Sequence, residues 1–487
     1  MFFNYRALVK IFGTILAIIS LSMLPSLIVS IIYNERDVLF AFVLTMTPML
    51  AIGCFLSLKV KPHSSHLTIR DSYIIVASCW ITGSILGALP FLISGYIPNF
   101  AHAFFETAAG FSTTGATILP NIEFLPKSLL FWRSFTHWIG GMGILVFAIA
   151  LLPSLGISGS RIIRAEVTGP TIGKLVPRLT DSTKILYFIY IGFTLLQVIL
   201  LLLGDMSLYD AMIHSFGSIG TGGFSNYNSG IAHFDSLYIE MIIVVFMFIG
   251  SINFNLYYLA LTGHWRDCFK DNELRIFITI LIGSLAIIAL NLWSSNIYAS
   301  FAEALRYSTF QSVSILTTTG FATDNFDAWP SLSKLILFLL MFIGGNSFST
   351  SGGIKIGRVL ILYQLLKRSI QMKLHPRAIV SIKVDHKAVP NETVAGVTNF
   401  VFLYIFIFVA GTILLSLENF DLLTTASAVA TCLGNVGIGL NLVGPMLNFS
   451  IFSQLSTIFL GFLMLVGRLE LFTILLLFSK QFWNPDK

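Results

Sequence analysis

Long and short apolar stretches follow one another along this chain. An α-helix needs about 20 residues to cross a hydrocarbon core about 30 Å thick. Ten stretches are long enough, and we expect spanning helices over about 11–33, 37–58, 73–97, 128–153, 183–204, 237–261, 274–296, 333–366, 394–417 and 452–482. Four others are too short to cross, and we expect short helices that enter the membrane and turn back over about 101–112, 208–219, 301–316 and 421–433.

The composition fits a helical membrane protein. Of the 487 residues, 55% are hydrophobic and 11% are charged, whereas soluble proteins carry about 25% charged residues. The apolar runs also exceed the roughly ten residues of a barrel strand. The first run is longer than the apolar core of a signal peptide, so we interpret it as a membrane helix. The cysteines are scattered without a CxxC spacing, which favours neutral thiols over a disulfide or zinc site: Cys54, Cys79, Cys268 and Cys432.

Each short segment ends at a motif of glycine and small residues. The motifs are Thr113-Thr114-Gly115-Ala116, Thr221-Gly222-Gly223-Phe224, Thr318-Thr319-Gly320-Phe321 and Val436-Gly437-Ile438-Gly439. They recur roughly every 100 residues, which indicates an internal repeat. We therefore predict an all-α polytopic membrane protein with four pseudo-symmetric repeats of helix, pore helix, extended segment and helix around one pore. An extra helix pair over 1–60 precedes the repeats, which span 61–160, 161–265, 266–366 and 367–487.

The residue types in these motifs suit a cation filter. A dehydrated cation needs oxygen ligands, and backbone carbonyls of extended segments can supply them. Glycine permits the required dihedrals and lets four segments converge, while neighbouring threonines add hydroxyl oxygens. A single motif could equally serve close helix packing, but four copies favour a filter. We take Gly220 and Asn435 as the equivalents of Thr113, and Gly222 as the equivalent of Gly115. The predicted potassium-binding residues are then Thr113, Thr114, Gly115, Gly220, Thr221, Gly222, Thr318, Thr319, Gly320, Asn435, Val436 and Gly437.

The distribution of charge predicts an orientation. Lysine and arginine concentrate in alternate loops, notably 161–184 and 367–387, which the positive-inside rule assigns to the cytoplasm together with both termini. The net charge of +6 therefore does not indicate nucleic-acid binding. Acidic residues gather in the opposite loops, where they would attract cations, although ordinary solvation explains any single one equally well. They are Glu106, Glu123, Asp205, Asp210, Asp235, Glu303, Asp324, Asp327, Glu418 and Asp421.

Two features inside apolar runs are candidates for a gate. Arg468 is costly at membrane depth, so it either pairs with Glu470 or another helix, or places a positive charge below the filter. The run 344–355 holds four glycines and several hydroxyl residues, which favour an unwound backbone over a straight helix. It forms either a packing kink or a mobile loop across the pore. The predicted gate residues are Arg468, Gly344, Gly345, Gly352, Gly353 and Lys355.

The sequence contains no pattern typical of an enzyme. We find no HExxH, Walker loop, GxGxxG or nucleophile elbow, so we expect neither catalysis nor a cofactor in this chain. His137 and His214 lie in or beside apolar segments, and we favour structural hydrogen bonds over proton coupling for both.

Several of these runs together resemble one known family. They are Thr113-Thr114-Gly115-Ala116-Thr117, His137-Trp138-Ile139-Gly140-Gly141-Met142-Gly143, Gly222-Gly223-Phe224-Ser225, Ser351-Gly352-Gly353-Ile354-Lys355 and Gly467-Arg468-Leu469-Glu470. Essentially the whole chain resembles the TrkH/KtrB/HKT superfamily of potassium transporters, and its extra N-terminal pair is more similar to the TrkH branch. Two positions depart from the family pattern, the loop with Asn346 and Phe348 and the last motif with Ile438 in place of proline.

The resemblance implies further properties of the protein. It implies a homodimer in a bacterial inner membrane, with a pore in each subunit. It also implies a cytosolic TrkA-like ring that binds nucleotides and controls opening, with Arg468 and the loop 344–355 as the constriction.

Two mechanisms of potassium transport are open at this point. We expect a gated, channel-like pore selective for potassium and rubidium, with weaker discrimination against sodium than in tetrameric potassium channels. The alternative is a symporter that couples potassium to protons or sodium by alternating access. Four repeats running in the same direction favour the pore, because inverted repeats are typical of alternating access.

Overall fold

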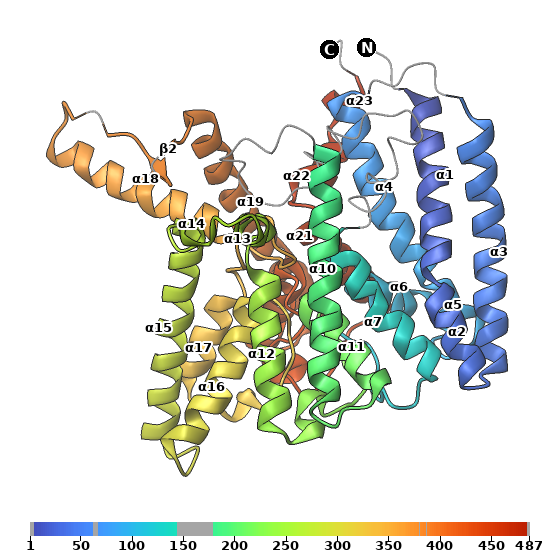
Figure 1. The fold of residues 1–487 in the computed structure, drawn as a ribbon. Helices are drawn as coiled ribbons and strands as arrows, with labels where there is room; N and C mark the ends of the chain where they lie inside the picture. The colour runs from blue at the N-terminus through green and yellow to red at the C-terminus, as the bar shows by residue number, and fades with distance from the viewer. Residues whose placement is uncertain (1–3, 62–66, 144–178, 379, 386, 485–487) are drawn as a thin grey trace.

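The computed structural model describes residues 4–61, 67–143, 179–378, 380–385 and 387–484 (Figure 1). These residues are almost entirely helical. Their strands form one small antiparallel sheet of β1 (Lys383–Val384) and β2 (Lys387–Ala388). The beginning of α1 (Tyr5–Ser22) and the last helix, α23 (Lys480–Trp483), lie at the same end of the molecule (Figure 1), as expected if both face the same side of a membrane.

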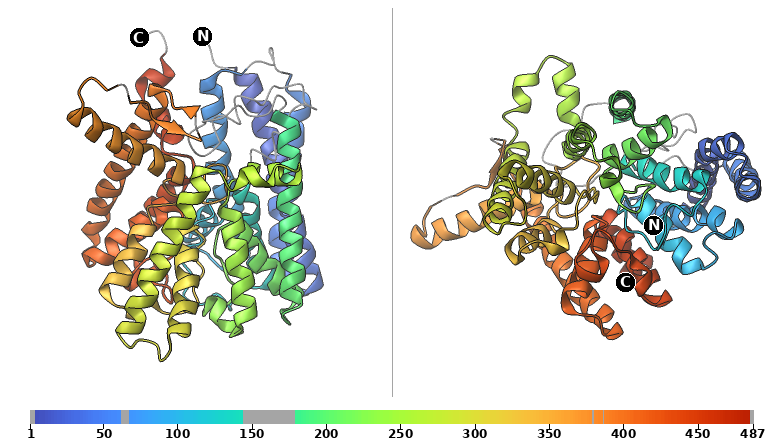
Figure 2. Two further views of the ribbon diagram at one scale, coloured as in Figure 1. Left: turned by 60° about the vertical axis from the view of Figure 1, so that its left-hand side comes forward. Right: turned by 90° about the horizontal axis from the view of Figure 1, so that it is seen from below.

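The first helices pack as an antiparallel layer beside the rest of the molecule (Figure 2). They are α1 (Tyr5–Ser22), α2 (Leu24–Ile32), α3 (Arg36–Lys59), α4 (Ile69–Gly87) and α5 (Leu89–Ile93). A Cβ atom added at Gly53 would lie 2.6 Å from the backbone nitrogen of Ala17. Small residues thus let α1 and α3 approach closely, as is common between membrane helices.

Four short helices occupy the predicted short segments. They are α6 (Phe100–Phe111), α11 (Leu208–Ile219), α16 (Phe301–Leu316) and α20 (Leu422–Gly434). Each begins at a polar residue whose side chain accepts a hydrogen bond from the backbone of the first turn: Asn99, Ser207, Ser300 and Asp421. Such caps satisfy amide groups that the first helical turn leaves free. The prediction of four short helices is confirmed.

The remaining helices of the described residues connect or flank these four. They are α7 (Lys127–Gly141), α10 (Leu179–Leu202), α12 (Leu237–Ser251), α13 (Phe254–Leu261), α14 (Trp265–Cys268), α15 (Asn272–Ser294), α17 (Ser331–Leu340), α18 (Ile356–Leu374), α19 (Asn391–Leu415), α21 (Gln454–Arg468), α22 (Phe472–Leu475) and α23 (Lys480–Trp483). Seen from below, the chain passes round a common centre in sequence order, from blue and cyan through green and yellow to red (Figure 2).

The prediction of ten spanning helices is only partly met. Among the described residues, six helical segments are long and apolar enough to cross a membrane, or eight if each of two bent pairs counts as one span. The helix predicted over 237–261 is not continuous, because α12 and α13 meet at 94°. The one over 452–482 is also not continuous, because α21 bends by 112° before α22. The predicted helix over 128–153 begins as α7, and its part beyond residue 143 lies outside the described residues.

The first bend is stabilised by contacts with a distant part of the chain. The carbonyl of Gly250 accepts a hydrogen bond from the amide of Thr350 at 3.2 Å, and that of Ser251 accepts one from Asn346 at 2.9 Å. Asn253 then caps α13, accepting from Asn255 at 3.0 Å. The last carbonyls of α12 are therefore satisfied by a distant loop rather than by continuation of the helix.

Candidate functional site

The four glycine motifs come together in one ring. A Cβ atom added at one glycine of each motif would lie 1.8–2.1 Å from a carbonyl oxygen of the next motif, far closer than two such atoms can approach. The pairs are Gly115 with Gly222, Gly223 with Thr319, Gly320 with Val436, and Gly437 with Thr114. Because the fourth motif returns to the first, the ring is closed, and only glycine fits at these four places.

The backbone conformation defines which residues are equivalent. The four ring glycines have φ of +78° to +93°, a region that glycine adopts without strain: Gly115, Gly223, Gly320 and Gly437. The residue two positions earlier also has positive φ, between 51° and 57°, in every motif: Thr113, Thr221, Thr318 and Asn435. We call residues 113–115, 221–223, 318–320 and 435–437 the ring segments.

This alignment corrects the predicted second segment by one residue. Gly220 has φ of −72° and ends α11 as its C-cap, so it lies outside the ring segments. The equivalents of Thr113, Thr114 and Gly115 are Thr221, Gly222 and Gly223. A signal was present in the sequence, because Phe224 follows Gly223 as Phe321 follows Gly320.

Each ring segment is tied to its own short helix. The amide of its middle residue donates to a carbonyl five residues earlier at 2.8–2.9 Å, from Thr114 to Ala109, Gly222 to Gly217, Thr319 to Ser314 and Val436 to Thr431. The same bond in all four motifs gives the segments the same shape. Repetition of local sequence therefore becomes repetition of geometry around the ring.

A polar side chain of the short helix supports the chain after the first, second and fourth ring segments. Glu106 accepts hydrogen bonds from the hydroxyl of Thr117 and the amide of Ile118, both at 3.0 Å. His214, at the equivalent position of the second repeat, contacts the Ser225 hydroxyl through Nε2 at 3.1 Å. In the fourth repeat Ser427 has this role and accepts from the amide of Leu440 at 3.0 Å.

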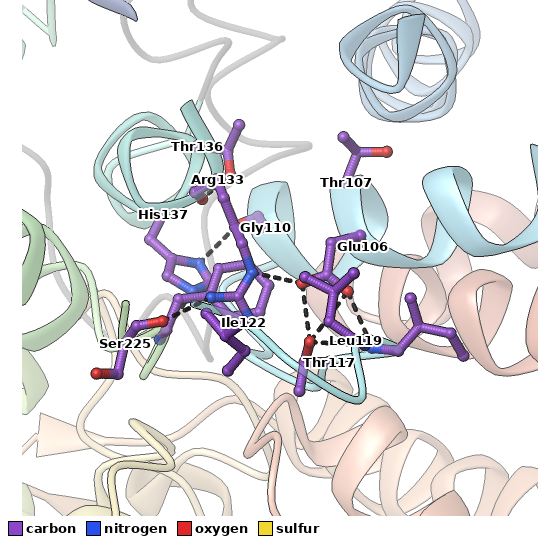
Figure 3. A network of polar contacts seen from close by, with 12 residues as sticks. Glu106, Thr107, Gly110, Thr117, Leu119, Ile122, Arg133, Thr136, His137 and Ser225 are labelled. Carbon is purple, nitrogen blue, oxygen red and sulfur yellow. Dashed lines mark hydrogen bonds and ion pairs between the residues drawn. The ribbon is translucent and has the colours of Figure 1, made fainter. Parts of the chain in front are cut away.

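A buried ion pair joins the first repeat to the second (Figure 3). The Arg133 guanidinium pairs with Glu106, and their side chains are 1% and 0% exposed. Arg133 also donates to the carbonyl of Ser225 at 2.9 Å and lies 3.4 Å from the centre of the Phe224 ring. Glu106 was predicted among the acids of the outer loops, and the structure corrects this, because the carboxylate lies inside the protein.

Both histidines make structural hydrogen bonds, as expected. His137 Nδ1 donates to the carbonyl of Gly110 at 2.8 Å, and its Nε2 accepts from the amide of Phe224 at 3.3 Å. His214 Nδ1 donates to the carbonyl of Asp210 at 2.8 Å. With a donor and an acceptor role on its two nitrogens, the His137 ring is held in one neutral tautomer.

The loops outside the ring form a second closed circle. Their links are Ile122 to Asn228 at 2.9 Å, Ile231 to Ala322 at 3.2 Å, Asn441 to Asp327 at 2.8 Å and Phe449 to Thr117 at 2.9 Å. Partial burial raises the pKa of the Asp327 carboxyl above its ordinary value, and the Asn441 bond opposes this. The four ring glycines line a pocket of about 110 Å³ between these loops.

A loop presses against the other end of the ring. Residues 341–355, which we call the inner loop, separate α17 from α18 where an unwound backbone was predicted. The amide of Gly352 donates to Thr318 Oγ1 at 2.7 Å, and the hydroxyl of Thr221 donates to Thr350 Oγ1 at 3.2 Å. A Cβ atom added at Gly352 would lie 2.8 Å from Asn435 Oδ1. The loop thus contacts three of the four ring segments.

The inner loop is held in place by a carboxylate of α15 and by a backbone hydrogen bond between its two ends. Glu273 of α15 accepts from the amide of Ser347 at 2.9 Å and from its hydroxyl at 3.1 Å. The loop closes on itself where the amide of Gly344 donates to Ile354 at 2.9 Å. The predicted hinge glycines Gly344, Gly345, Gly352 and Gly353 all lie in this closed turn.

Two buried, positively charged side chains, Arg468 and Lys355, lie at the end of the ring that faces the inner loop. Arg468 donates to the carbonyl of Thr350 and to those of Gly140 and Gly141, at 2.7 and 2.9 Å for the last two. Lys355 donates to the carbonyl of Ser351. Arg468 thus bonds to other helices and loops, which was one of the expectations for it, and the Glu470 carboxylate pairs with Arg358. The predicted gate residues are thus brought together beneath the ring.

Comparisons with known proteins agree along the whole chain. The family described as TrkH, cation transport protein, matches residues 39–485. A Trk system potassium uptake protein TrkH from Vibrio parahaemolyticus is 38% identical, covering 99% of this chain and 100% of the relative. One from Escherichia coli is 36% identical with the same coverage. The crystal structure of the potassium transporter TrkH from Vibrio parahaemolyticus superposes with a TM-score of 0.88 at 36% identity, over 99% of this chain and 100% of that one.

Proposed function

Because this chain belongs to the TrkH family of cation transport proteins, we propose that it takes up potassium as the membrane component of a Trk system. The observation that supports this most directly is the closed ring of four glycine-containing segments in one chain. Family membership makes it a transporter rather than an enzyme. Potassium is then the transported ion and not a cofactor.

Selection would take place in the ring segments. A potassium ion that sheds water needs several oxygen ligands at once, and four segments of the same shape offer repeated backbone oxygens around one axis. Rubidium has nearly the same demands, so it should follow the same path. The residues assigned to the filter are those of the ring segments, with Gly223 added to the predicted set and Gly220 removed.

Passage would be controlled by the inner loop. In the structure the loop lies against the ring, and the Arg468 guanidinium is bonded to its Thr350 carbonyl. A positive charge at this place opposes a cation leaving the ring. Opening would require the loop to withdraw, with the glycine pairs Gly344–Gly345 and Gly352–Gly353 taking up the change in backbone angles.

The larger assembly follows from the same proposal. We place four repeats of two spans each after an N-terminal pair, ten spans in all, with both termini cytoplasmic in a bacterial inner membrane. A second copy of the chain and a cytosolic, TrkA-like nucleotide-binding ring would be its partners. The alternative mechanism, symport with protons or sodium, shares the ring but requires a driving gradient of the second ion.

Uptake of radioactive rubidium by proteoliposomes tests the proposal. The liposomes contain potassium, and the outside solution contains traces of rubidium without a proton or sodium gradient. Uptake that external potassium suppresses and equal sodium leaves largely intact would support a selective pore. Uptake that begins only when a proton or sodium gradient is imposed would instead establish the symporter, and equal competition by sodium and potassium would overturn the filter assignment.

A further inference from the structure

The helices that precede the repeats, α1 to α3, contact the repeats through one carboxylate. We call these helices the N-terminal pair. Glu35 lies in the turn between α2 and α3 and is the N-cap of α3, but its side chain does not cap that helix. It accepts hydrogen bonds from the backbone amides of Lys127 and Ser128, at 2.7 and 3.0 Å, and from the Ser128 hydroxyl. A residue of the N-terminal pair thus caps the start of α7.

The helix α7 has no capping side chain of its own. Pro126 precedes it, and proline has neither an amide hydrogen nor a polar side chain. The helices that follow the second and fourth ring segments cap themselves instead, where Ser236 and Ser453 accept from an amide of the first turn. The first amides of α7 therefore depend on Glu35, and a carboxylate makes stronger hydrogen bonds to amides than a neutral oxygen does.

Further contacts hold the same point of the molecule. Nζ of Lys127 lies 4.3 Å from the centre of the Tyr33 ring, two residues before Glu35. The carbonyl of Lys127 accepts from the hydroxyl of Tyr209 at 2.6 Å. Tyr209 belongs to α11, the short helix that leads into the second ring segment, and α2 packs against α7. The first residue of α7 is therefore held jointly by the N-terminal pair and by the second repeat.

The other end of α7 contacts the ring. His137 joins the first two repeats, because it donates to the carbonyl of Gly110 and accepts from the amide of Phe224. A Cβ atom added at Gly222 would lie 2.2 Å from Cγ of His137, so the imidazole packs directly on the second ring segment. Since α7 is one continuous helix over residues 127–141, a shift of its first turn is carried along the helix to His137.

We propose that Glu35 is a positioning residue of the filter, which fixes the second ring segment through α7 and gives the N-terminal pair a role in cation selection. This inference rests on the proposed function, because it takes the ring as the selecting element. Oxygens held at one spacing discriminate between potassium and sodium, whereas oxygens that can move closer together also accept the smaller sodium ion. Loss of Glu35 should therefore change selectivity more than the rate of transport.

The test compares sodium competition in variants of the full chain. Glu35→Gln keeps the size of the side chain but replaces one acceptor oxygen by an amide group, so one of its bonds to α7 is lost. In proteoliposomes loaded with potassium, the sodium concentration that halves rubidium uptake should fall about fivefold relative to the wild type. The maximal rate of rubidium uptake should change by less than about twofold.

The matched control is Asp37→Asn. It removes an exposed carboxylate from the first turn of α3, close to Glu35 in the sequence. This variant should keep the sodium competition of the wild type.

A second substitution separates the connection to the N-terminal pair from simple capping. Pro126→Asp, combined with Glu35→Gln, gives α7 a capping side chain of its own, as α12 and α21 have. It should raise the melting temperature above that of Glu35→Gln without restoring the discrimination against sodium. Full recovery of discrimination would show that α7 needs only a cap, and would overturn the role of the N-terminal pair.

Two other results would overturn the proposal. One is unchanged sodium competition in Glu35→Gln, whatever its melting temperature, and the other is an equal loss of discrimination in Asp37→Asn. A wild type that does not prefer potassium and rubidium to sodium rejects the proposed function itself, whereas a selective wild type with an equally selective Glu35→Gln rejects only this role of Glu35.

A milder variant keeps the test decisive if Glu35→Gln does not fold. Ser128→Ala removes only the hydroxyl bond to the Glu35 carboxylate. It should shift sodium competition in the same direction by a smaller factor, and unchanged competition in this variant would then overturn the proposal.

Discussion

The two ends of the ring are held by different kinds of contact. Outside the ring, hydrogen bonds join each repeat to the next in a closed circle, and the buried Glu106–Arg133 pair reinforces the junction of the first two repeats. Inside, the inner loop is held by neutral hydrogen bonds, such as that from Gly352 to Thr318, and by the hydrogen bond that Arg468 donates to the carbonyl of Thr350 in the loop. One end is closed upon itself, and the other is covered by a segment with glycines at both of its ends.

The difference reflects how much each contact costs to break. Removing one partner of a buried ion pair costs about 3–5 kcal/mol, because the other charge is left without compensation. A neutral hydrogen bond contributes about 1 kcal/mol, and its groups can find other partners. The outer ion pair therefore suits a filter of constant shape, and the neutral bonds between the inner loop and the ring suit a gate that exchanges partners.

The largest effect is expected at the outer ion pair. Glu106→Gln leaves the buried Arg133 charge without its carboxylate and should destabilise the protein by about 3–5 kcal/mol. Thermal unfolding of the purified protein should show a large fall in apparent melting temperature, and surviving protein should discriminate less against sodium.

The control for this change is an exposed ion pair. Asp267 and Lys270 have side chains that are 55% and 70% exposed, so Asp267→Asn should leave the melting temperature unchanged. Equal melting temperatures for Glu106→Gln and the wild type would show that the buried ion pair does not stabilise the outer end of the ring.

The next largest effect is expected at a ring glycine. Gly223→Ala forces a Cβ atom to 2.0 Å from the carbonyl of Thr319 and adds about 1–2 kcal/mol of backbone strain from the left-handed conformation. Sodium should then compete with rubidium uptake nearly as well as potassium does.

Gly95 provides a control with the same backbone strain. Its φ is +78°, against +80° for Gly223, and an added Cβ would meet nothing within 4 Å. Gly95→Ala should keep the preference for potassium. Loss of preference in both variants would trace the effect to strain alone and count against the ring.

A smaller effect is expected at the inner cation. Arg468→Ala removes the hydrogen bond that holds the Thr350 carbonyl and the positive charge beneath the ring. We expect rubidium uptake to rise about tenfold, which corresponds to about 1.4 kcal/mol in the gate equilibrium. Unchanged uptake accompanied by a lower melting temperature would indicate that Arg468 only stabilises the fold.

The smallest effect is expected where α15 holds the inner loop. Glu273→Gln keeps one acceptor oxygen for Ser347 but replaces the other by an amide, so it weakens one hydrogen bond by about 1 kcal/mol. Uptake should rise a few-fold, by less than for Arg468→Ala. Glu392→Gln, at an exposed position in the first turn of α19, should not change uptake, and an equal rise there would remove the loop contact as the cause.

Local patterns predicted much of this architecture. The bounds predicted for the four short helices from their apolar runs agree with the structure to within one residue. The unwound segment before α18 follows from its glycines. Three of the four ring segments were also identified in the correct register, because threonine and glycine occupy the same places in the first and third motifs.

The remaining errors came from contacts between distant residues. Three glycines lie in or directly before the second motif, Gly220, Gly222 and Gly223, and only the backbone angles show which of them takes the place of Gly115 in the ring. The bend after α12 depends on amides of the inner loop about 100 residues later in the chain. Glu106 was taken for a surface acid because nothing in its own segment reveals that Arg133 lies against it.

The sequence by itself determined the helical membrane class, the four short helices, the glycine motifs and the break that becomes the inner loop, since all of these depend on hydrophobicity, capping and backbone freedom within a few residues. Only the tertiary structure decided how the ring closes, which glycine of the second motif belongs to it, and which threonine oxygens the inner loop covers. Those features depend on contacts between atoms of different repeats, and the local sequence of one repeat does not specify which carbonyl of another repeat its amide will contact.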